Sequence, residues 1–106
     1  MGRTDTSCTL VGSLLGAPIH STAIMLGFML VGPHNTYPEH GHAAHEGYHV
    51  VGGEGWFGGG LGLQLRGAGE VMVHQPHQPH AMETGGHQVL VCWVNSGDTF
   101  GEYYFL

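Results

Sequence analysis

Residues 37–48 read YPEHGHAAHEGY, and this stretch decides which fold and chemistry the chain is expected to have. Alternate residues of a strand share a face, so the side chains of His40 and His42 are expected to converge on one point. Glu46 can join them from the start of the next strand, after a turn at residues 43–44. Imidazole and carboxylate donors together suit Zn, Fe, Mn, Co or Ni better than Ca or Mg. The stretch therefore predicts a site for one divalent transition metal.

A fourth ligand has to come from a later part of the chain, and His80 is the best candidate. It ends the run HQPHQPH (residues 74–80), directly after a proline, at a point where a strand is expected to start again. The chain has ten histidines in 106 residues, so some histidine pairs arise by chance. Most of the others are expected at the surface or behind the ligands, although His34 or His77 could make a secondary metal contact. This expectation covers His34, His45, His49, His74, His77 and His87.

Glycine and proline are frequent, with 20 and 5 copies, and both are costly inside helices. Short strands separated by turns fit this composition better and predict an all-β sandwich or barrel. Strands are expected at residues 9–11, 21–31, 46–51, 55–57, 61–65, 71–73, 80–83, 88–94 and 102–105. Turns are expected at residues 32–33, 52–53, 58–60, 67–69, 85–86 and 95–98.

Charged residues make up 9% of the chain, and the formal net charge is −6. The two basic residues, Arg3 and Arg66, cannot form the basic stripe that a phosphate backbone requires, so no nucleic-acid partner is expected. The longest apolar stretch, residues 23–31, is far shorter than a bilayer-spanning helix, so no membrane partner is expected either. Cys8 and Cys92 lie far apart and form no C-x-x-C pair, which favours a reduced, cytoplasmic protein.

An H-x-H pair followed by a glutamate and then a glycine makes up most of the first of two cupin motifs. These positions are occupied here by His40, His42, Glu46 and Gly53. The glycine that should precede them is out of register, and the second cupin motif is matched in its histidine, His80, and only in part elsewhere. The chain thus resembles the cupins. The resemblance implies a single small cupin barrel, a double-stranded β-helix or jelly roll, with a homodimer through sheet edges as an option.

The chain also reads Tyr-Pro-x-His-x-His, then Glu-x-Tyr, then Gln-Pro-His-Ala-Met and Ser-Gly-Asp. This order is similar to that of the cupin-type dimethylsulfoniopropionate lyases, over roughly residues 25–99. The matching positions are Tyr37, His40, His42, Glu46, Tyr48, His80 and Ser96-Gly97-Asp98. Asn95 stands where the family tends to have Trp. The resemblance implies one cupin domain over residues 1–106, with its core at about residues 21–99 and without the N-terminal helical portion usual in the family.

The resemblance implies a β-elimination that yields dimethyl sulfide and acrylate, in which the metal acidifies the α-proton of the substrate and stabilises the enolate charge. The implied base is a tyrosine beside the metal, because a nearby dication favours the phenolate. We expect Tyr37 to act as the base and Tyr48 to lie by the metal or to orient the substrate. Aromatic side chains are expected to face the sulfonium, and the candidates for this pocket are Phe28, Trp56 and Trp93.

Three functions stay open at this point, because a fold and a metal site do not fix the chemistry. The first is the lyase, and the second is another metal-dependent cupin enzyme, such as a dioxygenase or an isomerase. The third is a non-catalytic cupin that binds a small ligand. Oxygen consumption with Fe(II) would favour the second, and ligand binding without metal would favour the third. As ordinary structural residues, Tyr37 and Tyr48 would be core or rim aromatics, and Trp56 and Trp93 would pack the barrel.

Overall fold

The computed structural model of the chain describes residues 5–12, 17–59, 62–97 and 103–105, with residues 5 and 103–105 described by their backbone. Every regular element in these ranges is a β-strand, which confirms the all-β prediction. The strands are β1 (Asp5–Gly12), β2 (Ile19–His20), β3 (Ile24–Val31), β4 (Thr36–His42), β5 (His45–Gly59), β6 (Gly62–Gly67), β7 (Val71–His74), β8 (His80–Glu83), β9 (Val89–Ser96) and β10 (Tyr103–Phe105).

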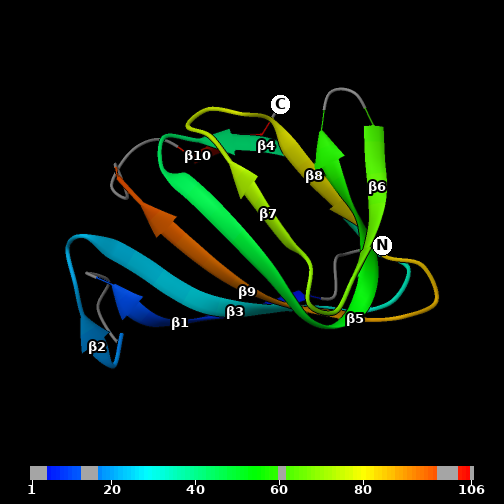
Figure 1. Cartoon of the computed structure of the whole chain (residues 1–106), viewed down its shortest axis with the longest axis horizontal. Helices are drawn as coiled ribbons and strands as arrows, with labels where there is room; N and C mark the ends of the chain where they lie inside the picture. Colours follow the sequence, from blue (N-terminus) through cyan, green and yellow to red (C-terminus); the bar gives the residue numbers. More distant parts are fainter. Residues whose placement is uncertain (1–4, 13–16, 60–61, 98–102, 106) are drawn as a thin grey trace.

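The strands follow the order β10-β4-β8-β5-β9-β3-β1-β2, and β6 and β7 also pair with β5. All pairings are antiparallel except that of β1 with β2. The long strand β5 links two layers, because its first part pairs with β7 and β9 and its last part with β6 and β8 (Figure 1). The described strands do not close into a ring, so the sheet is open and folded over on itself.

The hydrophobic core lies between the two layers, on the faces that the strands turn toward each other. Burial alternates along β3, where Met29 and Val31 are buried while Leu30 is 41% exposed. This is the two-residue period of a strand with one face in the core. Val50, Val89 and Val91 are fully buried, and each such side chain contributes about 1.5–3 kcal/mol. The core cluster is made up of Met29, Val31, Tyr48, Val50, Phe57, Met82, Val89 and Val91.

The turn expected at Gly52-Gly53 is wrong, because the chain continues there as a single strand, β5. The pairing of β5 with β9 shifts register between Val50 and Gly52, and Gly53 has a φ of 74°. A bulge of this kind adds one residue to a strand and exchanges the faces of all later side chains. Glu46 therefore points inward from the first part of β5, and Phe57 points inward from the last part. Two glycines in a row indicated a turn, whereas the backbone freedom of Gly53 serves the bulge.

Most of the other expected strands occur, with different ends. The strand expected at residues 88–94 runs on to Ser96, so Asn95 and Ser96 lie in β9 and not in the turn expected at residues 95–98. β2 was absent from the expected set, and β4 was expected only as the strand that carries His40 and His42, without bounds. Gly60, Leu61, Asp98 and Glu102 lie outside the described residues.

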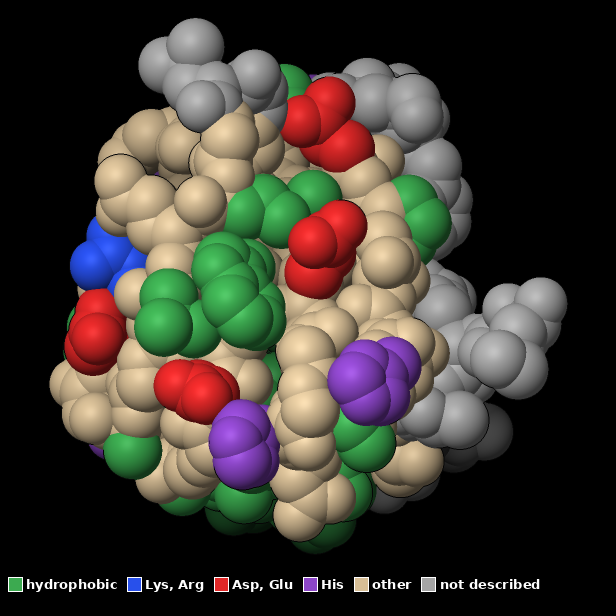
Figure 2. Space-filling view, turned by 90° about the vertical axis from the view of Figure 1, so that its right-hand side faces the viewer, with side chains coloured by type: hydrophobic (Ala, Val, Ile, Leu, Met, Phe, Trp, Pro, Cys, Tyr) green, Lys and Arg blue, Asp and Glu red, His purple; other side chains and the backbone are tan. Residues whose placement is uncertain are grey.

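Hydrophobic side chains gather on the face of the molecule in Figure 2, with acidic side chains spread around them and a basic side chain at the edge. The large hydrophobic residues with the most exposed side chains include Ile19, Leu65, Val71 and Val73. Cys8 and Cys92 are both free thiols. Within the described residues there is no helix of the length and hydropathy needed to cross a membrane.

Candidate metal centre

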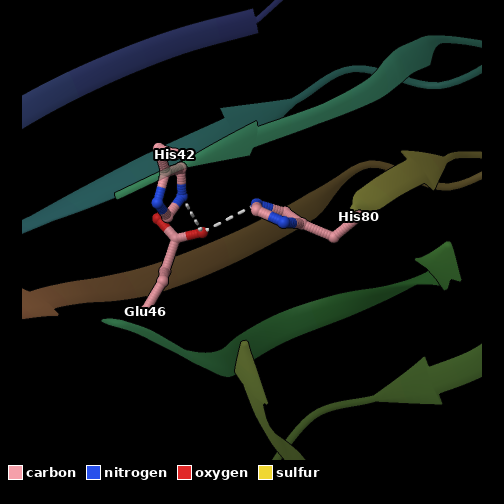
Figure 3. Close-up of side chains that lie close together, drawn as sticks. All are labelled: His42, Glu46 and His80. Atoms are coloured by element: carbon pink, nitrogen blue, oxygen red, sulfur yellow. Dashed lines mark hydrogen bonds and ion pairs between the residues drawn. The ribbon is translucent and has the colours of Figure 1, made fainter. Parts of the chain in front are cut away.

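Three of the four predicted ligands, His42, Glu46 and His80, meet between the layers, where each is buried. His42 ends β4, Glu46 is the second residue of β5 and His80 begins β8. The Glu46 Oε1 atom lies 3.2 Å from Nε2 of His42 and 3.0 Å from Nε2 of His80. Figure 3 shows both imidazoles directed at this one oxygen. Nitrogen and oxygen atoms of the three side chains all lie within 4.8 Å of one another, as donors to one ion would.

The chain turns between β4 and β5 at residues 43–44, as the sequence predicts, and this turn sets the orientation of His42. Its Nδ1 atom donates a hydrogen bond of 3.1 Å to the carbonyl oxygen of Ala44. In the same way, Nδ1 of His80 donates to the carbonyl oxygen of Gln78 at 2.9 Å. A carbonyl oxygen can only accept, so in the neutral imidazoles the proton is on Nδ1 and the lone pair is on Nε2. In the neutral form the lone pairs of both rings therefore face the carboxylate, and a protonated His42 donates from Nε2 to Glu46 Oε1 at 3.2 Å.

His40 lies beside this group but is not one of the three residues that meet within 4.8 Å. Its side chain is buried, its ring centroid is 4.0 Å from that of His80, and its Nδ1 donates to the Pro38 carbonyl oxygen at 2.8 Å. His40 and His80 are direct partners in the pairing of β4 with β8. The ligand role of His40 stays a prediction.

His74 belongs to this site, although the sequence alone placed it with the surface or supporting histidines. It ends β7, is buried, and is the direct partner of Glu46 in the pairing of β5 with β7. Its Nδ1 lies 3.6 Å from Glu46 Oε1, and its ring stacks on that of His80 with centroids 4.0 Å apart and planes at 12°. The site thus joins two cross-strand pairs, His40 with His80 in one layer and Glu46 with His74 in the other.

The electrostatics of the site centre on Glu46. Burial alone would raise the pKa of its carboxyl, but the hydrogen bond with His42 and the close approach of His74 and His80 outweigh burial and hold that pKa far below its ordinary value. The hydrogen bond to Glu46 raises the pKa of His42 despite the burial of the ring. Burial lowers the pKa of His40 from 6.5 to about 4, against the effect of its bond to Pro38. At neutral pH the site therefore holds one carboxylate among imidazoles, of which His40 is neutral.

These residues fit a divalent metal ion. His80 Nε2 and His74 Nδ1 are buried and have no hydrogen-bond partner among the described residues, although both lie close to Glu46 Oε1. Buried polar atoms rarely go without a partner, so a cation bound between these nitrogens and the carboxylate is the simplest way to give them one. Metal–ligand bonds of about 2.1 Å would place neighbouring donors of a tetrahedral ion roughly 3.4 Å apart. The separations of 3.0 to 3.6 Å from Glu46 Oε1 suit that arrangement.

A cavity of 200 Å³ opens beside the centre, and both predicted catalytic tyrosines line it. Tyr37 has its ring centroid 4.6 Å from that of His40, and buried Tyr48 has its centroid 5.0 Å from that of His74. The lining consists of Ser7, Met29, Tyr37, His40, Glu46, Tyr48, Trp93 and Asn95. The Oδ1 atom of Asn95 is buried there without a hydrogen-bond partner among the described residues.

Of the three aromatic residues expected in the substrate pocket, Trp93 is the one that lines this cavity. Trp56 is 38% exposed, next to inward-facing Phe57 on β5. Phe28 lies between the buried Gly27 and Met29 on β3, so it belongs to the opposite face of that strand. Neither Trp56 nor Phe28 is among the residues of the 200 Å³ cavity.

The two histidines expected to be able to make secondary metal contacts, His34 and His77, both lie in turns with positive φ, at 56° and 60°. Both are exposed, and neither belongs to the group of donors found among the described residues. The backbone N–H of His77 donates to the His42 carbonyl oxygen at 2.7 Å, so this turn supports the end of β4.

Residues 4–91 match the model of a family described as dimethylsulfoniopropionate lyase. No curated protein matches the chain.

Solved structures similar to this one show the fold. The dimethylsulfoniopropionate lyase DddQ from Ruegeria pomeroyi DSS-3 has a TM-score of 0.87 at 24% identity, over 95% of this chain and 51% of that one. A structure described under the dimethylsulfoniopropionate lyases RdDddP and RnDddQII has a TM-score of 0.86 at 21% identity, over 96% and 52%. The polyketide cyclase RemF from Streptomyces resistomycificus has a TM-score of 0.80 at 19% identity, over 99% and 73%. The chain spans about half the length of the first two.

Proposed function

Because the chain belongs to the dimethylsulfoniopropionate lyase family, we propose that it cleaves dimethylsulfoniopropionate to dimethyl sulfide and acrylate with the help of one divalent metal ion. The observation that carries this proposal is the 200 Å³ cavity in which Tyr37 and Tyr48 lie together with Glu46 and His40. Two phenol groups beside a cluster of metal donors form a site for removing a proton from a small molecule.

His42, Glu46 and His80 would hold the metal, with His40 as the further predicted ligand. Zn, Fe, Mn, Co and Ni all suit this mixture of imidazole and carboxylate donors. A metal bound there would supply Lewis-acid charge beside the carboxylate of the substrate, next to the carbon that loses its proton.

Tyr37 is the proposed base. Acting as a phenolate, its Oη takes a proton from the substrate carbon next to the carboxylate. The electron pair of that C–H bond becomes the second bond of the C=C unit, and the C–S bond breaks. The sulfur atom leaves with the C–S electron pair as neutral dimethyl sulfide, acrylate remains, and Tyr37 holds the proton until it passes to solvent.

Tyr48 and Trp93 are proposed to position the substrate. Tyr48 is 7% exposed and packs against His74 and Phe57, so its ring is well packed in the cavity wall. The face of the Trp93 ring would attract the sulfonium charge, an interaction worth about 0.5–2 kcal/mol. Loss of that charge in the product would weaken this attraction and help dimethyl sulfide to leave.

The partner in this proposal is a small organic ion, and the proposed location is the cytoplasm. The free thiols of Cys8 and Cys92 support a reducing compartment.

The test is to measure dimethyl sulfide in the headspace and acrylate in solution for protein loaded separately with Zn, Fe(II), Mn, Co and Ni. The proposal predicts equimolar products that require metal and that fall at least about a hundredfold in Tyr37→Phe. Bound metal without either product, for every metal, would move the function to another substrate or to ligand binding.

A further inference from the structure

His74 has the burial and placement of a functional group, yet no predicted role uses it. His74 is only 6% exposed. His77, which belongs to the same run (residues 74–80) and is also not a predicted ligand, is exposed in a turn. Buried histidines are usually hydrogen-bonded, and Nδ1 of His74 has no hydrogen-bond partner among the described residues. The position of this nitrogen therefore requires an explanation.

The nitrogen faces the same oxygen as the predicted ligands. His74 Nδ1 lies 3.6 Å from Glu46 Oε1, and His42 and His80 approach that atom at 3.2 and 3.0 Å. The direct pairing of Glu46 with His74 across β5 and β7 fixes this approach through the backbone. The near-parallel stacking of the His74 ring on His80, with planes at 12°, leaves each ring edge directed at the carboxylate.

We propose that His74 is an additional metal ligand, which binds the ion through Nδ1 together with His42, Glu46 and His80. His74 is not one of the three residues whose donor atoms all lie within 4.8 Å of one another, so its ring would shift toward the ion when the ion binds. This inference rests on the metal centre of the proposed function. His74 and His80 also line a second cavity, of 490 Å³. The ion would thus lie between two cavities, with Glu46 and His40 facing one and His74 facing the other.

The experiment uses Co(II), whose visible spectrum and X-ray absorption report the ligands directly, on the full chain. His74→Phe removes the donor and keeps a ring that can stack on His80. His74→Asn keeps a polar atom near the position of Nδ1 but removes the imidazole. His77→Asn is the matched control, because it removes a histidine of the same run and Asn tolerates the positive φ of that turn.

The wild-type chain is expected to bind one Co(II). His74→Phe should lower the affinity at least about tenfold, measured against a competing chelator, and change the visible spectrum. X-ray absorption should count one imidazole fewer in both His74 variants than in the wild type, while His77→Asn should match the wild type. If His74→Phe does not fold, as judged by circular dichroism, the imidazole count of His74→Asn decides whether His74 is a ligand.

An unchanged affinity, spectrum and imidazole count in the folded His74 variants would overturn this inference and leave the metal centre standing. A wild-type chain that binds no Co(II) and no other divalent metal would overturn the centre and this inference together.

Discussion

Glu46 Oε1 lies 3.0 Å from His80 Nε2, although Glu46 is the second residue of β5 and His80 is the first residue of β8, in different parts of the chain. The contact does not have hydrogen-bond geometry, and His80 Nε2 is buried without a partner among the described residues. Two cross-strand pairs, one in each layer, bring these atoms together. The site is therefore a product of how the layers face each other, and local sequence supplies only its individual donors.

The bulge in β5 should depend on one glycine and not on its neighbour. A Cβ at Gly53 would collide with the carbonyl oxygen of Gln88, and its φ of 74° is unfavourable for other residues. A Cβ at Gly52 would meet nothing within 4 Å. Gly53→Ala should therefore lower the free energy of unfolding by roughly 2 kcal/mol or more, while Gly52→Ala should change it little. Urea denaturation compares the two, and equal effects would contradict the bulge.

His40 should make the metal-free protein less stable as the pH falls from 6.5 to about 4. Burial lowers its pKa in the folded state to about 4, so over this range the unfolded chain binds a proton that the folded chain does not. The resulting loss is at most about 3 kcal/mol. His40→Asn keeps a donor for the Pro38 carbonyl oxygen and lacks the titrating ring, so its stability should fall less over the same range.

The measurement for His40 is urea denaturation of both proteins in chelator at pH 7.5 and at pH 4.5. Subtracting the stability of the variant from that of the wild type also cancels the opposite contribution of His42. The raised pKa of His42 adds stability below pH 6.5 in both proteins. A stability gap between wild type and variant that stays constant with pH would show that His40 is not held neutral by burial.

The two tyrosines of the cavity should differ in their kinetic roles. If Tyr37 is the base, Tyr37→Phe should lower kcat by about 10² to 10⁴ with little change in bound metal. If Tyr48 orients the substrate, Tyr48→Phe should act mainly on KM. Steady-state kinetics with measured metal content separate these cases, and the reverse pattern would exchange the two roles.

Trp93 should contribute to substrate binding, whereas Trp56 should not. Trp93 lines the cavity, and Trp56 is 38% exposed on the outer face of β5. Loss of a cation–π contact of about 1 kcal/mol predicts a rise in KM of roughly fivefold for Trp93→Leu. Trp56→Leu is the matched control and should leave KM unchanged. Equal values of KM in both variants would rule out the proposed contact between Trp93 and the sulfonium.

Much of the fold follows from local sequence patterns. The alternating burial of β3, the turn after His42 and the start of β8 at His80 are all visible in the sequence. The Gly52-Gly53 bulge is not, because a glycine pair supports a turn and a bulge equally well, and only the neighbouring strand decides between them.

The candidate site was predictable where its residues are near in sequence or, like His80, match a family motif, and not where only the meeting of distant strands brings a residue in. His40, His42 and Glu46 lie within one short stretch, so their spacing is informative. His74 sits in a proline-containing run whose repeats look alike, and one of its histidines is exposed while two are buried. The register that pairs Glu46 with His74 determines which of these histidines reaches the site. That register depends on the long-range pairing of β5 with β7. The unpartnered ring nitrogen of buried His74 becomes visible only in three dimensions.

The most direct test of metal-dependent cleavage is to titrate metal into metal-free protein and measure bound metal and dimethyl sulfide release in parallel. The metal is the one of Zn, Fe(II), Mn, Co and Ni that gives the highest rate. We expect no release before metal is added, a rate that rises in proportion to bound metal and levels off at one equivalent, and the loss of both in Glu46→Gln. Release by the metal-free protein at the full rate, or one equivalent of bound metal with no release, would contradict the proposed function.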